Sequence, residues 1–82
     1  MASATLDLED LRATVADVLD VDVPEVTDEV DFIEDLGVDS LMALEVMVVL
    51  EKKYSVKIAE NELREVTNLK KAYDLLTAKL AA

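Results

Sequence analysis

The sequence predicts an all-α fold: a small four-helix bundle with three longer helices, one short third helix and a long first connection. The chain of 82 residues fits one domain, residues 1–82, and apolar residues recur at helical spacing in three of its segments. A single Gly and a single Pro leave few helix breakers. Because the chain has no Cys, no disulfide or thiolate metal site can stabilise this fold, which must depend on helix packing.

The first helix is expected between residues 6 and 19, where the apolar stripe consists of Leu8, Leu11, Val15, Val18 and Leu19. Pro24 closes this segment, since proline disfavours helix at the residue before it. Residues 21–39 then form the long connection, and some of its apolar residues are expected to attach it to the core: Val26, Val30, Phe32, Ile33 and Leu36. A loop of this length is uncommon in a compact domain and suggests a functional role.

The second helix is expected from about Leu41 to Lys53, after a turn at Gly37 and a cap at Asp39 or Ser40. Its core face consists of Ala43, Val46, Met47, Leu50 and Tyr54. The opposite face carries apolar residues around one acid: Leu41, Glu45, Val48 and Lys52, with Met42 and Val49 on the flank. Either this face docks a partner, or the loop residues Phe32 and Ile33 cover it.

The remainder of the chain predicts two further helices. An extended link at residues 55–58 leads to a short helix over about residues 60–65. Thr67 or Asn68 then caps the last helix, whose apolar stripe consists of Leu69, Ala72, Tyr73, Leu76 and Leu80.

The net charge of −11 is distributed unevenly along the chain. Residues 1–51 hold 15 of the 19 acids and one base, a net charge of −14, whereas residues 52–82 hold seven bases and four acids, a net charge of +3. The negative charge of residues 1–51 repels nucleic acid and anionic membranes, so neither is an expected partner. It attracts basic protein surfaces, unless the charge serves only to keep a small protein soluble.

The N-terminal segment lacks the basic and apolar regions of a signal peptide. The longest apolar stretch, Val46 to Leu50, is too short to span a bilayer. We therefore expect a cytoplasmic monomer, and the initial Met1 and the fit to one domain favour a free-standing protein.

The residue types disfavour catalysis and metal binding. The chain has no His and no Cys, the side chains that most often act as general base or nucleophile. Asp31, Asp35 and Asp39 stand at four-residue intervals and Gly37 is misplaced, so the loop does not match a calcium-binding EF-hand. The acids are interpreted as a solvated face, and we predict neither a metal site nor an enzyme.

Ser40 is the candidate for chemistry of another kind. A serine without a base partner is a poor nucleophile, but its hydroxyl can be an attachment point. Free backbone N–H groups and the helix dipole at a helix N-terminus favour a phosphate there. The alternative interpretation is that Asp39 and Ser40 form only a capping signal.

The segment Phe-Ile-Glu-Asp-Leu-Gly-Val-Asp-Ser-Leu, residues 32–41, resembles the attachment segment of acyl carrier proteins. The resemblance continues through residues 43–46, 50–54 and 56–58 to Thr67-Asn68-Leu69, and so covers essentially the whole chain. Gly-x-Asp-Ser-Leu in this helical frame is a specific signature, stronger than Asp-Ser alone.

This resemblance implies that Ser40 carries 4′-phosphopantetheine through a phosphodiester, with Asp39 and Leu41 beside it. A phosphopantetheinyl transferase would install the group from coenzyme A, and any magnesium would belong to that reaction. Acyl groups would then be carried as thioesters on the terminal sulfur of the 4′-phosphopantetheine arm. The prosthetic group would thus supply the thiol that the chain, which has no Cys, lacks. The expected further partners are an acyltransferase, a ketosynthase or other acyl-processing enzymes with basic docking surfaces.

Two further sets of residues follow from the resemblance. The partner interface would comprise Asp35, Asp39, Leu41, Met42, Glu45, Val48 and Glu51. Candidate residues lining an acyl pocket between the helices are Phe32, Met47, Leu50, Ile58, Val66 and Ala72, each of which could equally be ordinary core.

Departures from the fatty-acid type favour polyketide or other specialised acyl metabolism. Met42 stands where fatty-acid carriers often have an acid, and Ala59 stands where many relatives have Pro. Lys52 and Lys53 make the end of the second helix less acidic than in typical fatty-acid carriers. A housekeeping fatty-acid carrier or an aminoacyl carrier is the alternative within the class. Outside it, the alternative is an unmodified helical adaptor that binds a partner through the same second-helix patch.

Overall fold

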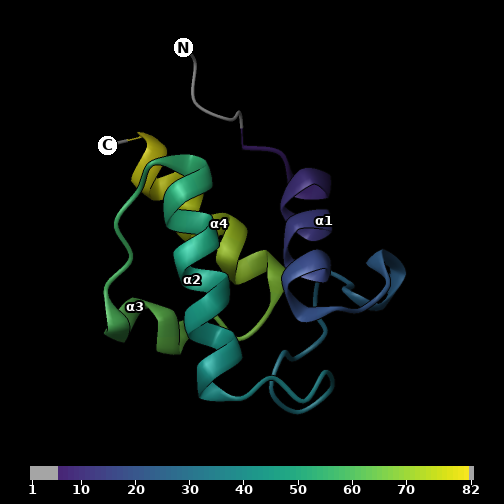
Figure 1. The fold of residues 1–82 in the computed structure, drawn as a ribbon. Helices are drawn as coiled ribbons and strands as arrows, with labels where there is room; N and C mark the ends of the chain where they lie inside the picture. The colour runs from purple at the N-terminus through teal and green to yellow at the C-terminus, as the bar shows by residue number, and fades with distance from the viewer. Residues whose placement is uncertain (1–5, 82) are drawn as a thin grey trace.

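The computed structural model describes residues 6–81, which contain four α-helices and one short 3-10 helix (Figure 1). They are α1 (Leu8–Leu19), η1 (Val23–Glu25), α2 (Ser40–Tyr54), α3 (Glu60–Glu65) and α4 (Leu69–Ala81). The predicted four-helix fold is confirmed, with three long helices and a short third one. Within these residues no helix is long and apolar enough to cross a membrane.

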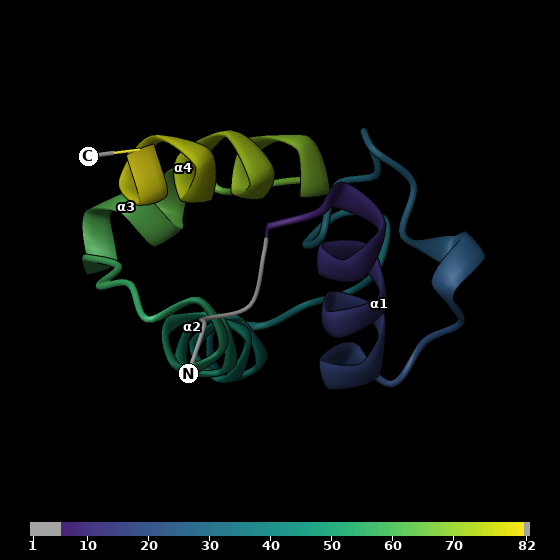
Figure 2. The same ribbon diagram turned by 90° about the horizontal axis from the view of Figure 1, so that it is seen from above.

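The three long helices surround a common core (Figure 2), and an ion pair between Glu62 and Lys79 links α3 to α4. Each long helix contributes buried apolar residues, and the connections add others: Leu11, Val15 and Leu19 from α1, Leu50 and Tyr54 from α2, Leu69, Ala72 and Leu76 from α4, and Val26, Phe32, Val38 and Ile58 from between the helices. The predicted core face of α2 is confirmed, since Ala43, Val46 and Met47 are partly buried against this cluster.

Polar side chains fix where the helices begin. The Asp7 carboxylate accepts a hydrogen bond from the Asp10 N–H at 3.3 Å, at the start of α1. At the start of α4, the Asn68 side chain accepts one from the Lys71 N–H at 2.9 Å, so Asn68 rather than Thr67 supplies this cap. Asp20 and Ser55 follow α1 and α2 in the left-handed conformation, with φ of 57° and 54°, which ends each helix.

A polar cluster joins the start of α1 to the end of α2. The buried Tyr54 donates its hydroxyl to the Asp10 carboxylate at 3.0 Å, and Lys53 forms an ion pair with Asp10 at 2.9 Å. The hydrogen bonds from Lys53 and Tyr54 lower the pKa of Asp10. Burial, together with the neighbouring Asp10 carboxylate, raises the pKa of Tyr54 to about 12.

The short helix α3 is held to α4 through one carboxylate. Glu62 accepts a hydrogen bond from the Ala59 N–H at 2.9 Å and forms an ion pair with Lys79 of α4 at the same distance. The Ala59 bond, followed by the Lys79 interaction, lowers the pKa of Glu62. A proline at position 59 has no N–H and could not make this bond, so Ala59 contributes directly to the start of α3.

The connection between α1 and α2 is more ordered than a plain loop. It contains η1, and its backbone is tied to the rest of the fold by the Phe32 N–H, which donates to the Thr67 carbonyl at 2.9 Å. Val26 and Phe32 are buried as expected, and Val38 is buried too. The expectation that Ile33 packs in the core is wrong, since its side chain is 63% exposed. A tight turn over residues 32–36 directs Ile33 outward.

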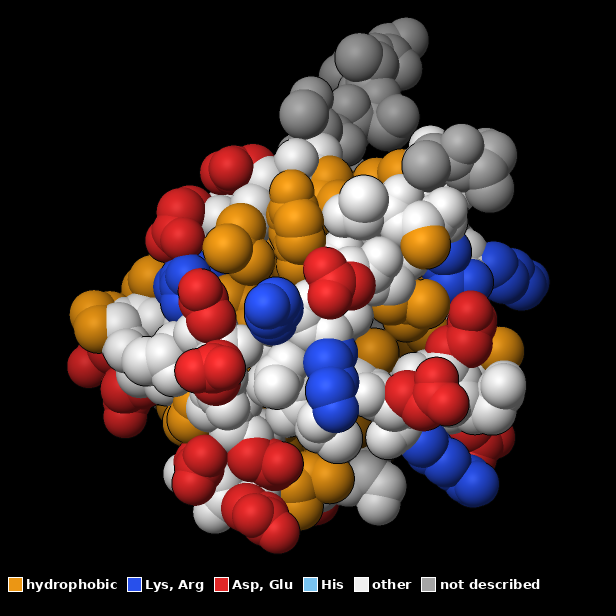
Figure 3. Space-filling model, turned by 180° about the vertical axis from the view of Figure 1, so that it is seen from behind, with side chains coloured by type: hydrophobic (Ala, Val, Ile, Leu, Met, Phe, Trp, Pro, Cys, Tyr) orange, Lys and Arg blue, Asp and Glu red, His pale blue; other side chains and the backbone are white. Residues whose placement is uncertain are grey.

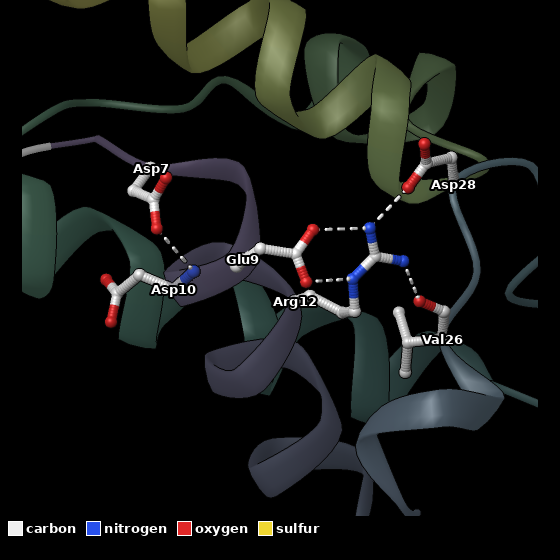
Figure 4. Close-up of polar contacts among 6 residues, drawn as sticks. All are labelled: Asp7, Glu9, Asp10, Arg12, Val26 and Asp28. Carbon is white, nitrogen blue, oxygen red and sulfur yellow. Dashed lines mark hydrogen bonds and ion pairs between the residues drawn. The ribbon is translucent and has the colours of Figure 1, made fainter.

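Arg12 ties the middle of this connection to α1 (Figure 4). Its guanidinium forms two hydrogen bonds with the Glu9 carboxylate, at 2.9 and 3.1 Å, on the same helix. It also donates to the Val26 carbonyl and forms an ion pair with Asp28. One largely buried cation thus holds Val26 and Asp28, in the middle of the connection, against α1.

Candidate functional site

Ser40 is the first residue of α2 and is exposed to solvent. The preceding residue, Asp39, has extended backbone, and its carboxylate accepts a hydrogen bond from the Met42 N–H at 2.9 Å. Asp39 is therefore the helix cap. The cap does not require the Ser40 hydroxyl, which lies at the positive end of a 15-residue helix.

Gly37 shapes the turn that delivers Ser40 to this position. Its φ is +68°, in the left-handed region that other residues rarely occupy. A Cβ added there would meet no atom within 4 Å, so the backbone conformation and not a lack of space accounts for the glycine. The turn predicted at Gly37 is confirmed.

The acids of the connection support its backbone. The Asp31 carboxylate accepts hydrogen bonds from the N–H groups of Ile33 and Glu34 at 2.9 and 2.8 Å. Asp35 accepts one from the Asp31 N–H at 2.9 Å. Asp31 and Asp35 thus stabilise the local backbone and also contribute to the negative charge of the segment that precedes Ser40.

A cleft of about 470 Å³ opens beside Ser40, within the range of small-molecule sites. The connection, the first half of α2 and the short helix α3 form its walls. Its lining is mostly apolar: Leu19, Phe32, Ile33, Val38, Ala43, Leu44, Val46, Leu63 and Val66, with Asp39, Ser40, Glu60, Arg64 and Thr67 as polar members. Ile33, which was expected in the core, instead lines this cleft.

The six candidate acyl-pocket residues meet around a different and much smaller cavity. Phe32, Met47, Leu50, Ile58, Val66 and Ala72 all line a space of about 20 Å³ inside the core. That volume holds about one water molecule and no acyl chain. Only Phe32 and Val66 also reach the large cleft, so most of the space beside Ser40 is lined by residues that the sequence did not suggest, Leu44 and Leu63 among them.

The outer face of α2 is open to solvent. Leu41 is 67% exposed and Val48 is 42% exposed. The alternative that Phe32 and Ile33 cover this face is wrong, because Phe32 is buried in the core and Ile33 lies at the cleft. A shallow groove of about 490 Å³ follows the face, lined by Val18, Leu41, Leu44, Glu45, Val48 and Val49.

The acids near this face differ in their surroundings. Glu45 and Asp39 are exposed, and Asp39 also caps α2. Glu51 is half-buried, and its carboxylate accepts a hydrogen bond from the Ile58 N–H at 2.8 Å, which braces the link between α2 and α3. Of the four acids expected at the interface, Asp35, Asp39 and Glu51 each accept a backbone hydrogen bond, and Glu51 is the one that is half-buried.

An exposed hydroxyl at a helix N-terminus, beside an apolar cleft, suits covalent attachment of a phosphate-linked chain better than catalysis. The chain has no His or Cys to activate a nucleophile. Within residues 6–81, no three acidic side chains come together in a way that could hold a metal ion. The positive end of α2 suits the phosphate, and the cleft suits the apolar part of the chain that follows it.

Comparison with known proteins agrees with this geometry. The sequence profile of the family described as "Phosphopantetheine attachment site" matches residues 9–76. The chain belongs to this family of phosphopantetheine-bearing carrier domains. It is a carrier of acyl intermediates with a 4′-phosphopantetheine prosthetic group, not a catalyst, and it works with acyl-processing synthase enzymes.

The chain is similar to several acyl carrier proteins. The chain is 62% identical over 78 residues to the polyketide-8 synthase acyl carrier protein 2 of Streptomyces avermitilis, covering 95% of this chain and 90% of that one. It is 37% identical over 75 residues to the acyl carrier protein of Thermosynechococcus vestitus, covering 92% and 93%. The solved acyl carrier protein of Enterococcus faecalis shares the fold, with a TM-score of 0.72, 22% identity and coverage of 90% and 99%.

Proposed function

We propose that the prosthetic group is attached to the Ser40 Oγ through a phosphodiester. This proposal is carried by the exposure of Ser40 at the first position of α2, directly after the Asp39 cap and beside the apolar cleft. The bound group would supply a terminal thiol on which acyl cargo is carried as a thioester. The chain's own residues supply the attachment oxygen, the helix N-terminus that favours the phosphate, and the cleft.

The cargo that we favour is a polyketide-type acyl chain. The support is the 62% identity to a relative named as a polyketide synthase carrier, compared with 37% to a carrier whose name states no such pathway. The partners would then be a phosphopantetheinyl transferase, which installs the group from coenzyme A, and an acyltransferase and a ketosynthase, which act on the cargo. We further propose that the protein is a monomer in the cytoplasm.

These partners would dock on the outer face of α2. Leu41 and Val48 offer apolar contact, and Asp35, Asp39 and Glu45 offer negative charge for a basic partner surface. Met42 would add less contact than expected, because its side chain is partly buried against the core. Glu51 lies at the far end of this face and takes a smaller part, since its carboxylate already binds the Ile58 N–H. So small a surface suits weak and rapidly exchanging contacts, as a shuttle between enzymes requires.

The cleft would shelter the arm and the first part of its cargo. Phe32 and Val66 are the two predicted acyl-pocket residues that reach it. Met47, Leu50, Ile58 and Ala72 line only the small inner cavity, so they would take part only if that cavity expanded around a longer chain.

The attachment is tested by intact mass after incubation with coenzyme A and a broad-specificity transferase. We expect a gain of about 340 Da, the mass of the group, on the native chain and none on Ser40→Ala. Ser55→Ala is the matched control, because Ser55 is also exposed and lies just after the other end of α2. A gain of mass on Ser40→Ala would contradict the assignment, and the absence of any gain on the native chain would contradict the attachment itself.

A further inference from the structure

Leu44 occupies a position on α2 at the boundary between the cleft and the groove of the outer face. It lies four residues after Ser40, one helical turn along the same side of the helix. Its side chain is 43% exposed, which is unusual for a leucine in the middle of a helix that packs in a bundle. A chain attached to Ser40 must therefore pass Leu44 when it runs along α2.

Leu44 also lies between two apolar hollows. It lines the cleft on the side of α3, together with Val38, Leu63 and Val66. It lines the shallow groove on the side of α1 too, together with Val18 and Val48. Among the described residues, it is the one that the linings of the cleft and of the groove have in common.

The two hollows offer different shelter. The cleft is walled by the connection, α2 and α3, and reaches buried side chains such as Phe32 and Val38. The groove is lined by residues of α1 and α2 only, and its floor includes the exposed Leu41 and Val48. A thioester in the cleft is shielded from water, whereas one in the groove lies on the surface where partners dock.

We propose that Leu44 is a partition that keeps cargo carried on Ser40 in the cleft and out of the groove, so that its side chain determines how well the thioester is protected. This role rests on the proposed attachment to Ser40. Leu44 is a positioning residue: it forms no bond with the cargo, and it acts by filling the space over which an apolar chain would otherwise spread.

The test uses the full chain loaded with an octanoyl group that is ¹³C-labelled at its terminal methyl. Nuclear Overhauser contacts from this methyl report its position, and cleavage of the thioester by hydroxylamine reports its protection. In the native protein we expect contacts to Val38, Leu63 and Val66. In Leu44→Ala we expect additional contacts to Val18 and Val48, and cleavage about fivefold faster, which corresponds to about 1 kcal/mol of lost apolar contact.

Two variants separate a partition from a general loss of apolar surface. Leu80→Ala on α4 removes a similarly exposed leucine side chain that lines neither the cleft nor the groove, so the cargo should stay in place. Leu44→Met keeps the volume at position 44 and should behave like the native protein. Circular dichroism checks that each variant keeps its helices, which we expect because Leu44 lies outside the buried core.

The outcomes divide cleanly between the two proposals. A protein that gains no prosthetic group overturns the attachment to Ser40 and with it the role of Leu44. A modified protein in which Leu44→Ala keeps the native contacts and cleavage rate overturns the role of Leu44 alone. So does a native protein whose label already contacts Val18, or a Leu80→Ala variant that shifts the cargo as much as Leu44→Ala.

Discussion

Arg12 shows how much one side chain can contribute in a chain so rich in acids. It is the only base among residues 1–51, and its side chain is only 13% exposed. It neutralises Glu9 and Asp28 while it satisfies the carbonyl of the buried Val26. Without it, two like charges and an unpaired carbonyl would remain where the connection meets α1.

We expect Arg12→Met to lower the free energy of unfolding by about 2 kcal/mol, because several charge-assisted hydrogen bonds are lost at a largely buried site. Arg64→Met is the matched control, since Arg64 forms one exposed ion pair with Glu60 four residues away, worth about 0.3 kcal/mol. Urea unfolding measures both losses. Equal losses in the two variants would show that the contacts of Arg12 add nothing to those of an ordinary surface pair.

Tyr54 gives a pH dependence that can be attributed to one residue. Its pKa is raised from 10.0 to about 12 in the folded protein, so the folded state holds the phenol proton more tightly than the unfolded state. The associated stability is present below pH 10 and is lost as the pH rises toward 12.

Tyr54→Phe should therefore weaken the decline of unfolding free energy between pH 10 and about 12. At pH 7 it should cost about 1 kcal/mol, the value of the lost hydrogen bond to Asp10. Urea unfolding at several pH values measures both effects, with Tyr73→Phe on α4 as the control for the same chemical change. An unchanged alkaline slope in Tyr54→Phe would mean that other groups cause the decline.

At the scale of elements, the start of α2 combines two roles in Asp39. Its carboxylate caps the helix through the Met42 N–H, and its charge lies beside the exposed Ser40 and Leu41. Asparagine caps a helix about as well as aspartate but carries no charge, so substitution can separate the two roles.

We expect Asp39→Ala to lower the free energy of unfolding by about 1 kcal/mol, and Asp39→Asn to leave it nearly unchanged. Both variants should associate with the transferase about twofold more slowly at low salt, because both lack the charge. Stopped-flow association and urea unfolding provide the two readouts. If Asp39→Asn associates as fast as the native protein, the charge of Asp39 has no part in docking.

The sequence predicted most of the elements because their signals are local. Apolar spacing identified the core faces of α1, α2 and α4, except that Leu80 at the end of the α4 stripe is exposed, and Gly37 indicated the turn before α2. The choice between Asp39 and Ser40 as cap stayed open, since both residue types are good caps and only the backbone decides which one lies outside the helix.

The remaining features depend on contacts between distant segments. Ile33 was expected in the core and Leu44 was not expected at the cleft, because periodicity does not predict how an irregular connection and α3 approach α2. The bond from the Ile58 N–H to Glu51 joins residues seven apart across a turn, which no helical pattern indicates. The acyl-pocket residues did meet, but around a cavity of about 20 Å³.

At the scale of the whole molecule, the charge is polarised along the chain. The net charge of −14 over residues 1–51 includes the connection and α2, while residues 52–82 carry a net charge of +3. On the face turned away from Figure 1, lysine and arginine side chains are interspersed with acidic and apolar ones (Figure 3). The electric field of these charges should therefore orient a basic partner toward residues 1–51 before contact.

Removal of one acid should then matter only on the side where partners dock. We expect Glu45→Gln on α2 to slow association with the transferase about two- to threefold at low salt, and Glu65→Gln on α3 to have little effect. The difference should disappear at high salt, where charges are screened. Equal effects of the two substitutions would mean that the total charge, rather than its distribution, controls the encounter.

The central claim is that Ser40 carries the prosthetic group, and localisation of the added mass tests it most directly. After modification, trypsin cleavage at Arg12 and Lys52 releases residues 13–52, whose only hydroxyl-bearing side chains are Thr14, Thr27 and Ser40. Fragmentation of this peptide should place the added mass, about 340 Da, on the fragments that contain Ser40 and on none that contain only the threonines. Added mass on a threonine, or a peptide without it, would contradict the account.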